Sequence, residues 1–304
     1  MPLACSGVRY EFASGDIPRS AKTCSSGAPQ KRQGGCVMGP GEPSACAAPA
    51  VAAETQADLL LGNNVLAHVP DLNDFVGGMK VLLADDGVIT MEFPHLMQLM
   101  ELNQWDTIYH EHFSYFSFGT ASRVFEAHGL RLFDVEELPT HGGSLRVYGA
   151  HAEDPGKEQT ERARELLERE RAAGFDELET YTRYGERVQA DKRDILAFLI
   201  EQKSEGRRLA GYGAPAKGNT LLNYCGIGTD FLAYTCDLNP HKQDHLLPGS
   251  HIPIRPPDAL REDQPDVVLI LPWNLKDEIV DQLSFIREWG GRFAARAPEL
   301  ALLP

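Results

Sequence analysis

The pattern of apolar and polar residues changes abruptly at Ala57. Before that point the chain is rich in Gly, Ser, Pro and Ala and shows neither a helical nor a strand period. Such a segment buries too little apolar area to offset the entropy that is lost on ordering. We therefore expect residues 1–56 to be a disordered or aberrant leader that lies outside the fold.

The pattern over residues 57–152 predicts alternating strands and helices. The first helix is expected to begin after Asp71, an N-cap residue. Its apolar face then consists of Leu72, Phe75, Met79 and Leu82. The full predicted order is strand 58–61, helix from 72, strand 87–94, helix 96–105, helix 118–129, and antiparallel strands 130–139 and 142–151. This is the order of the second half of a doubly wound sheet that ends in an antiparallel edge.

The remaining residues predict a helical connector and a second α/β unit. Residues 153–205 are heavily charged with few apolar anchors, which is typical of helices with a solvated face. Residues 206–304 repeat a strand, a turn and a helix, and the first turn is rich in Gly. We therefore predict an α/β chain: a partial doubly wound sheet, a helical connector and a Rossmann-like domain.

Composition and charge narrow the functional classes. The 304 residues are 42% hydrophobic and carry a formal net charge of −15, which argues against nucleic acid or an anionic membrane as a general partner. The longest apolar runs are too short to span a bilayer. The first residues lack the basic-then-apolar order of a secretory signal. Six cysteines do not suggest a disulfide scaffold, so we expect a cytoplasmic protein.

Four of the cysteines lie in the leader. Cys5, Cys24, Cys36 and Cys46 contain no close Cys-x-x-Cys pair, which zinc modules usually use to reduce the cost of closing the site. We therefore expect no zinc site, and no other metal site, in this chain.

The candidate chemistry lies in DTIYHEHFSYFS, residues 106–117. It holds imidazole, carboxylate and phenol groups within seven residues, and such groups transfer protons near neutral pH. Aromatic residues between them could exclude water. A surface loop with two structural histidines is the alternative interpretation.

A second candidate site is the turn that contains Gly211, Gly213 and Lys217. Glycines permit a tight turn, Lys217 can meet a phosphate, and free N–H groups at a helix start favour an anion. The spacing is not G-x-G-x-x-G, so a dinucleotide site is only weakly indicated. Close packing of strand against helix explains the glycines equally well.

With these residues laid out, residues 57–304 resemble the S-adenosylmethionine-dependent sugar C-methyltransferases, which act on nucleotide-linked keto-sugars. The matching segments are GNNVLAHVPDLNDFVGG, GVITMEFPH, DTIYHEHFSYFS, LPTHGGSLRVYGAH and GYGAPAKGNTLLNYCGI. The resemblance implies that residues 57–152 are the C-terminal half of a class I methyltransferase domain. It also implies that residues 206–304 help to hold the nucleotide-sugar.

Two parts of the family pattern do not occur before Ala57. They are a zinc module with paired cysteines and the first half of the methyltransferase sheet, with its Gly-rich loop for S-adenosylmethionine. We therefore expect a truncated or frameshifted reading frame in which the loop that binds the cofactor is missing; a genuine but divergent N-terminus is the alternative.

The resemblance also implies roles for particular residues. His112 is the expected base that removes a proton next to the ketone, so that the enolate can attack the sulfonium methyl group. Glu111 is expected to raise the pKa of His112 and to fix its tautomer. The further expected site residues are Tyr109 and His68 for catalysis, Asn63 and Asn64 for the cofactor, and Ser144, Arg146, Lys217 and Asn219 for the substrate. For Ser144 and Arg146, a polar edge strand is the alternative.

Two other functions stay open. A chain that keeps the nucleotide-sugar domain but cannot hold S-adenosylmethionine would be a binding remnant without catalysis. A nicotinamide oxidoreductase would use the Gly211 turn and Asp237, although the position of Lys217 in the turn counts against it.

Overall fold

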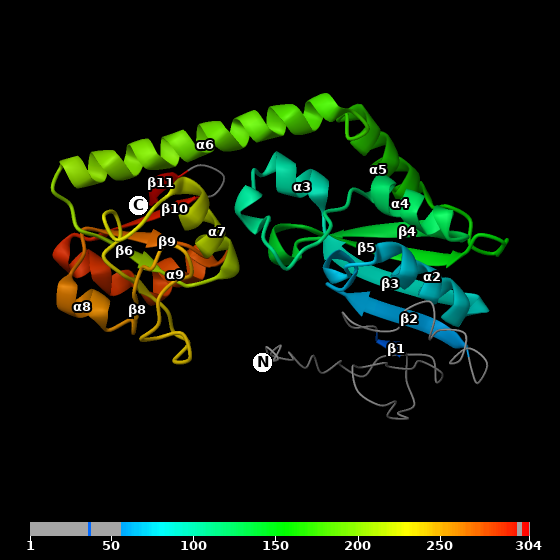
Figure 1. The fold of residues 1–304 in the computed structure, drawn as a ribbon, viewed down its shortest axis with the longest axis horizontal. Coiled ribbons are helices and arrows are strands. Elements are labelled where there is room, and N and C mark those ends of the chain that lie inside the picture. The colour runs from blue at the N-terminus through cyan, green and yellow to red at the C-terminus, as the bar shows by residue number, and fades with distance from the viewer. Residues whose placement is uncertain (1–35, 38–55, 297–299, 304) are drawn as a thin grey trace.

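The computed structural model describes residues 36–37, 56–296 and 300–303. Within these ranges the chain forms two α/β units that are joined by helices (Figure 1). The leader cysteines Cys5, Cys24 and Cys46 lie outside the described residues.

The N-terminal unit is a five-stranded sheet with the strand order β1-β2-β3-β5-β4. Strands β1 to β3 run parallel, whereas β5 is antiparallel to both β3 and β4. The elements of this unit are β1 (Cys36–Val37), β2 (Ala57–Asn63), η1 (Leu66–His68), α2 (Leu72–Leu82), β3 (Leu83–Pro94), α3 (Leu96–Glu101), η2 (Trp105–Thr107), α4 (Phe118–Ala127), β4 (Leu130–Leu138), η3 (Thr140–Gly142) and β5 (Ser144–His151). The parallel strands and the antiparallel pair confirm the predicted half of a doubly wound sheet.

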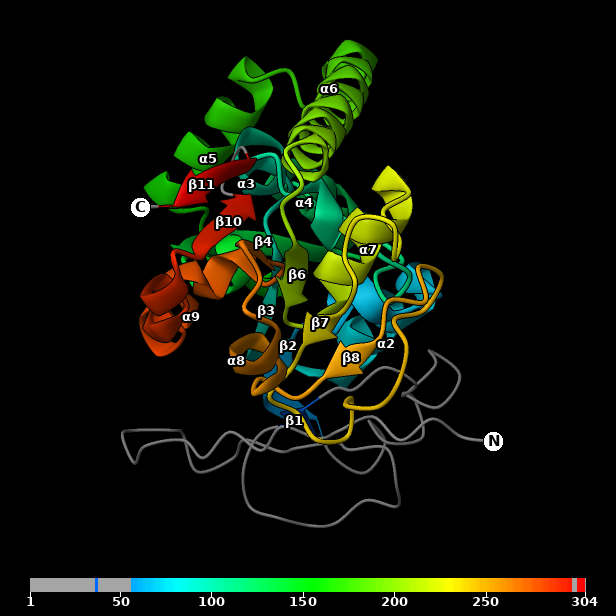
Figure 2. The same ribbon diagram turned by 90° about the vertical axis from the view of Figure 1, so that its left-hand side faces the viewer.

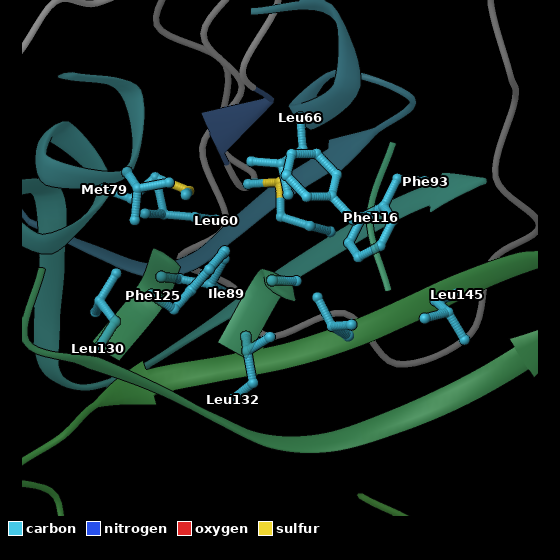
Figure 3. Packing of buried hydrophobic residues seen from close by; sticks show 14 of the residues in the cluster. Leu60, Leu66, Met79, Ile89, Phe93, Phe116, Phe125, Leu130, Leu132 and Leu145 are labelled. Atoms are coloured by element: carbon cyan, nitrogen blue, oxygen red, sulfur yellow. The ribbon is translucent and has the colours of Figure 1, made fainter. Parts of the chain in front are cut away.

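Local signals explain most of these boundaries. Asp71 caps α2, since its side chain accepts a hydrogen bond from the backbone N–H of Asp74 at 3.0 Å. Gly129 ends α4 with a φ of 68°, a conformation that glycine adopts without strain. The apolar face of α2 and the aromatic face of α4 pack on the sheet, where Met79 and Phe125 meet Leu60 and Ile89 in one buried cluster (Figure 3).

Three details differ from the sequence prediction. Cys36 and Val37 pair in parallel with Leu60 and Leu61, so part of the segment expected outside the fold extends the sheet. The predicted strand 87–94 begins at Leu83, because residues 84–87 are accommodated as an irregularity within β3. The helix predicted over 96–105 ends at Glu101 and is followed by the short turn η2.

Two helices connect the units, as the charge-rich sequence predicted. They are α5 (Glu161–Ala172), which packs on the N-terminal unit through Leu166, and α6 (Leu178–Ser204), which packs on the C-terminal unit through Ile195 and Leu199. Figure 1 shows α6 running alongside both units.

The C-terminal unit is a six-stranded sheet with the order β11-β10-β9-β6-β7-β8. Only β11 is antiparallel to its neighbour. Helices cover both faces (Figure 2), and successive residues of β9 alternate between the two apolar layers. The elements are β6 (Leu209–Tyr212), α7 (Ala216–Cys225), β7 (Thr235–Cys236), β8 (Ile254–Arg255), α8 (Ala259–Asp263), β9 (Val267–Ile270), η4 (Trp273–Leu275), α9 (Lys276–Gln282), η5 (Ser284–Trp289), β10 (Arg292–Arg296) and β11 (Leu300–Leu303).

The strand order places a topological switch point beside β6. From β6 the chain moves to β7 on one side, while β9 lies on the other side. Open parallel sheets bind ligands outside the carboxyl ends of strands at such a point. The turn after β6, which leads into α7, and the turn after β9, which contains η4, therefore meet where a ligand is expected.

Candidate active site

The predicted proton-transfer residues gather at the carboxyl edge of the N-terminal sheet. His68 lies at the end of η1, directly after β2, and residues 109–115 form a loop that packs against η1. The backbone N–H groups of Phe113 and Ser114 both donate to the carbonyl of Ala67, at 2.8 and 3.3 Å. These two hydrogen bonds hold the 109–115 loop against η1, although the two segments are about 45 residues apart in the sequence.

His112 is at the centre of an aromatic cluster. Its ring centroid lies 4.6 Å from that of His68, 5.0 Å from that of Tyr109 and 5.4 Å from that of Tyr115. Within the described part of the chain, its buried Nδ1 atom has no hydrogen-bond partner. A buried polar atom without a partner requires an explanation, and a role in catalysis is a common one.

The electrostatic environment keeps His112 neutral. Burial and the neighbouring His68 lower the pKa of His112 to about 4, although Glu111 acts in the opposite direction. Glu111 raises the pKa of His112, as expected, but desolvation outweighs the nearby carboxylate, so the net shift is downward. At neutral pH the ring is in the form that can accept a proton.

Tyr115 organises the loop and was not among the predicted site residues. Its hydroxyl accepts a hydrogen bond from the backbone N–H of Tyr109 at 3.0 Å and donates to the carbonyl of Thr107 at 3.2 Å. Burial raises the pKa of Tyr115 to about 12, and it also raises the pKa of Tyr109. Both phenols therefore stay protonated near neutral pH. The aromatic spacing in YHEHFSY was the available signal for Tyr115.

Asn63 and Asn64 lie where a cofactor was predicted, at the carboxyl end of β2. Asn63 is exposed, and Asn64 has a φ of 54° with its backbone N–H bonded to the carbonyl of Glu92 at 2.8 Å. Glu92 stands beside Asn63 in the strand register and is 7% exposed. Glu92 was not among the predicted site residues. The available signal was that Glu92 is the one charged residue in the otherwise mostly apolar segment GVITMEFP.

Arg146 pairs with this carboxylate. Its guanidinium donates to Glu92 at 3.1 Å and lies 3.6 Å from Glu136, and Thr140 also donates to Glu92, at 3.2 Å. Because β5 lies between β3 and β4, Arg146 is not on an edge strand. Ser144 is fully buried, and its hydroxyl donates to the carbonyl of Thr140 at 3.2 Å.

The two predicted phosphate contacts are in α7 of the other unit. The Lys217 ammonium donates to Asn274 at 2.8 Å and lies 4.3 Å from the ring centroid of Trp273, a cation–π contact. Burial lowers the pKa of Lys217. In the described part of the chain, Asn219 Oδ1 is buried without a hydrogen-bond partner, and α7 has no side-chain cap. Two polar groups and free helix N–H groups therefore adjoin the switch point.

The residues needed for a nicotinamide site are engaged within the protein. The Asp237 carboxylate, which would bind the ribose, accepts the N–H of Ala214 at 2.7 Å and lies 3.6 Å from Lys242. At Gly211 an added Cβ would lie 2.8 Å from the hydroxyl of Thr235. These contacts favour the packing explanation for the glycine-rich turn.

Residues 36–37, 56–296 and 300–303 contain no cluster of three or more potential metal ligands. Among the helices of the same ranges, none is both long enough and apolar enough to cross a bilayer.

Comparisons with known proteins agree with the sequence resemblance. Residues 139–298, more than half of the chain, match the family model described as the C-methyltransferase C-terminal domain. C-methyltransferase NovU of Streptomyces niveus is 40% identical over 246 residues, which are 80% of this chain and 58% of NovU. The chain thus spans less than two thirds of the length of this relative.

The solved structures are more distant. Magnesium protoporphyrin IX methyltransferase from Synechocystis PCC 6803, with S-adenosylhomocysteine bound, is 12% identical with a TM-score of 0.27, covering 32% of this chain and 46% of its own. A TehB-like methyltransferase from Corynebacterium glutamicum is 16% identical with a TM-score of 0.23, covering 32% of this chain and 48% of its own.

Proposed function

The chain belongs to the family defined by the C-methyltransferase C-terminal domain, and we propose that it takes part in methyl transfer from S-adenosylmethionine to a carbon atom of a nucleotide-linked keto-sugar. The observation that carries the proposal is the cluster of His112, His68, Tyr109 and Tyr115 at the carboxyl edge of a parallel strand pair. This is the edge at which open α/β sheets bind their ligands.

His112 acts as the base in this reaction. Its neutral imidazole takes the proton from the carbon next to the ketone, and the electron pair of the broken C–H bond forms the enolate. With S-adenosylmethionine bound, the enolate carbon would take its methyl group from sulfur, and S-adenosylhomocysteine would be the by-product. Glu111 stabilises the imidazolium that forms, because it is the nearby group that favours the charged ring.

The described residues fit one side of the cofactor. The exposed amide of Asn63 and the amide of Asn64 stand at the end of β2 with hydrogen-bonding groups of both kinds. S-adenosylmethionine supplies an electrophilic methyl group when it is bound. The partly buried rings of His68, Tyr109 and Tyr115 limit the access of water to the enolate, which would otherwise be reprotonated.

The nucleotide part of the substrate binds at the switch point of the C-terminal sheet. Lys217 supplies a positive charge there, and the uncapped start of α7 supplies N–H groups for a phosphate. The partial burial of Lys217 strengthens its attraction for an anion, since screening by water is reduced.

Transfer of a labelled methyl group tests the proposal. The chain is incubated with S-adenosylmethionine that carries a ¹³C methyl group and with nucleotide-linked keto-sugars, and the product is observed by NMR. A new carbon-bonded methyl signal is the expected result, and a methyl group on oxygen would contradict the proposal. Binding of the sugar without any transfer identifies a binding remnant. A fluorescence titration with NADH that shows binding identifies an oxidoreductase.

A further inference from the structure

A buried polar cluster joins the segment that leads into the 109–115 loop to the C-terminal unit. We define it as the Asp106 cluster: Asp106, Asp191, Trp273 and Arg296. Asp106 belongs to η2 and precedes the loop 109–115 in the chain, whereas Trp273 and Arg296 follow it by 167 and 190 residues. Asp191 comes from α6. The cluster thus gathers residues from both units and from the connecting helix.

Each charged group of the Asp106 cluster has specific partners. Trp273 Nε1 donates to Asp106 Oδ2 at 2.7 Å, and the Arg296 guanidinium donates to Asp106 Oδ1 at 3.2 Å. Arg296 also donates to Asp191 at 2.7 Å and to the backbone carbonyl of Asn103. Asp106 is 0% exposed and Arg296 is 3% exposed, so water cannot replace a lost partner at either group.

The position of Asp106 couples this cluster to the loop. Thr107 and Ile108 are bonded back to Gln104 and Trp105 through their backbone N–H groups, so η2 forms a rigid start for the loop. Burial is the main cause of the raised pKa of the Tyr109 phenol, and the charges of Glu111 and Asp106 add to it. A displacement of Asp106 therefore moves the residues that surround His112.

We propose that Trp273 and Arg296 are positioning residues of the active site: from the C-terminal unit, they fix the 109–115 loop in place by holding Asp106. The inference rests on the proposed function in one respect, namely that this loop carries the base. It assigns to the C-terminal unit a second role besides binding of the nucleotide. The active site is then complete only when the two units are docked.

The test removes one hydrogen bond and follows the loop in the ligand-free protein. Trp273→Phe deletes the indole N–H but keeps an aromatic ring under Lys217. Trp289→Phe is the matched control, because the Trp289 indole N–H donates to the carbonyl of Pro265 at 3.0 Å in the same unit. Asp106→Asn is a second variant of nearly identical shape that weakens the pairing with Arg296.

Two readouts report on the loop rather than on the fold. The amides of Phe113 and Ser114, which bond to Ala67, should exchange with solvent about tenfold faster in Trp273→Phe, as expected for a lost net hydrogen bond. The pKa of His112, measured by NMR, should rise from about 4 as the ring gains water. The Trp289→Phe variant should change neither quantity, even where its melting temperature falls as far.

Unchanged exchange at Phe113 and Ser114 in both Trp273→Phe and Asp106→Asn would overturn the inference. The same conclusion follows if Trp289→Phe loosens the loop as much as Trp273→Phe does. Neither readout uses a cofactor or a sugar. A failure of methyl transfer therefore does not affect the inference about the loop, and a failure of that inference does not affect the proposed methyl transfer.

Discussion

The rings of His68 and His112 meet edge to face, with a centroid separation of 4.6 Å and an interplanar angle of 90°. A charge on His68 disfavours protonation of His112. Replacement of His68 by Asn should therefore raise the pKa of His112 from about 4, but not to the ordinary value of 6.5, because the larger cause, burial, persists.

Titration of the ring protons by NMR measures this change. His110→Asn is the control, since His110 is an exposed histidine two residues before His112 in the same loop. A pKa of His112 that stays the same in His68→Asn would show that the two rings do not interact electrostatically.

The assignment of the base can be tested without a cofactor. In D₂O the chain should accelerate the exchange of hydrogen for deuterium at the carbon next to the ketone of a nucleotide-linked keto-sugar. His112→Asn should slow this exchange by about 10²-fold or more, the usual contribution of a general base. His110→Asn should leave the exchange rate near that of the unaltered chain.

The pH dependence of this exchange follows from the lowered pKa. Below a pH of about 4 the His112 ring is protonated and cannot accept a proton, so the rate should fall there. Above that pH the ring stays neutral, and its contribution should be constant through the neutral range. A midpoint near 6.5 would point to a histidine with an ordinary pKa as the base.

The pairing of Arg146 with Glu92 should matter for stability as well as for the site. Arg146→Leu leaves the nearly buried Glu92 carboxylate without its charged partner, which we expect to cost about 1–3 kcal/mol. Arg162→Leu removes an exposed ion pair with Asp134, which water screens, and should cost clearly less than Arg146→Leu. Unfolding in urea compares the two free energies, and equal losses would mean that Glu92 is effectively solvated.

The helices and most strands could be predicted from local features of the sequence. The pKa of His112 and the contacts of Asp106 could not, because they depend on burial and on packing between distant segments. The Asp71 cap and the glycine at position 129 act within one turn of their helices, so α2 and α4 were predicted from neighbouring residues. Strands β7 and β8 contain two residues each, and strands this short show no detectable alternation of apolar and polar residues. Their pairing depends on the sheet around them.

The contact of Arg296 with Asp106 spans 190 residues, and nothing in the sequence near either residue indicates it. An arginine within the apolar segment RFAAR was the available signal, since a buried charge needs a partner. The sign of the His112 shift was missed for a related reason. The carboxylate of Glu111 is visible in the sequence, but the burial that outweighs it arises from tertiary packing.

Substitution of Gly218, which lies beside the switch point, can distinguish a glycine needed for close packing from one needed for ligand binding. Gly185 in α6 serves as the comparison. An added Cβ at Gly218 of α7 would lie 2.7 Å from the Cβ of Leu271, so Gly218→Ala should overpack the contact between helix and sheet and cost about 1–3 kcal/mol. Gly185 of α6 has no atom within 4 Å of its added Cβ, so Gly185→Ala should stabilise that helix by about 0.5–1 kcal/mol. Chemical unfolding of both variants gives the two signs. A neutral Gly218→Ala that abolishes nucleotide binding would instead mean that this glycine makes room for the ligand.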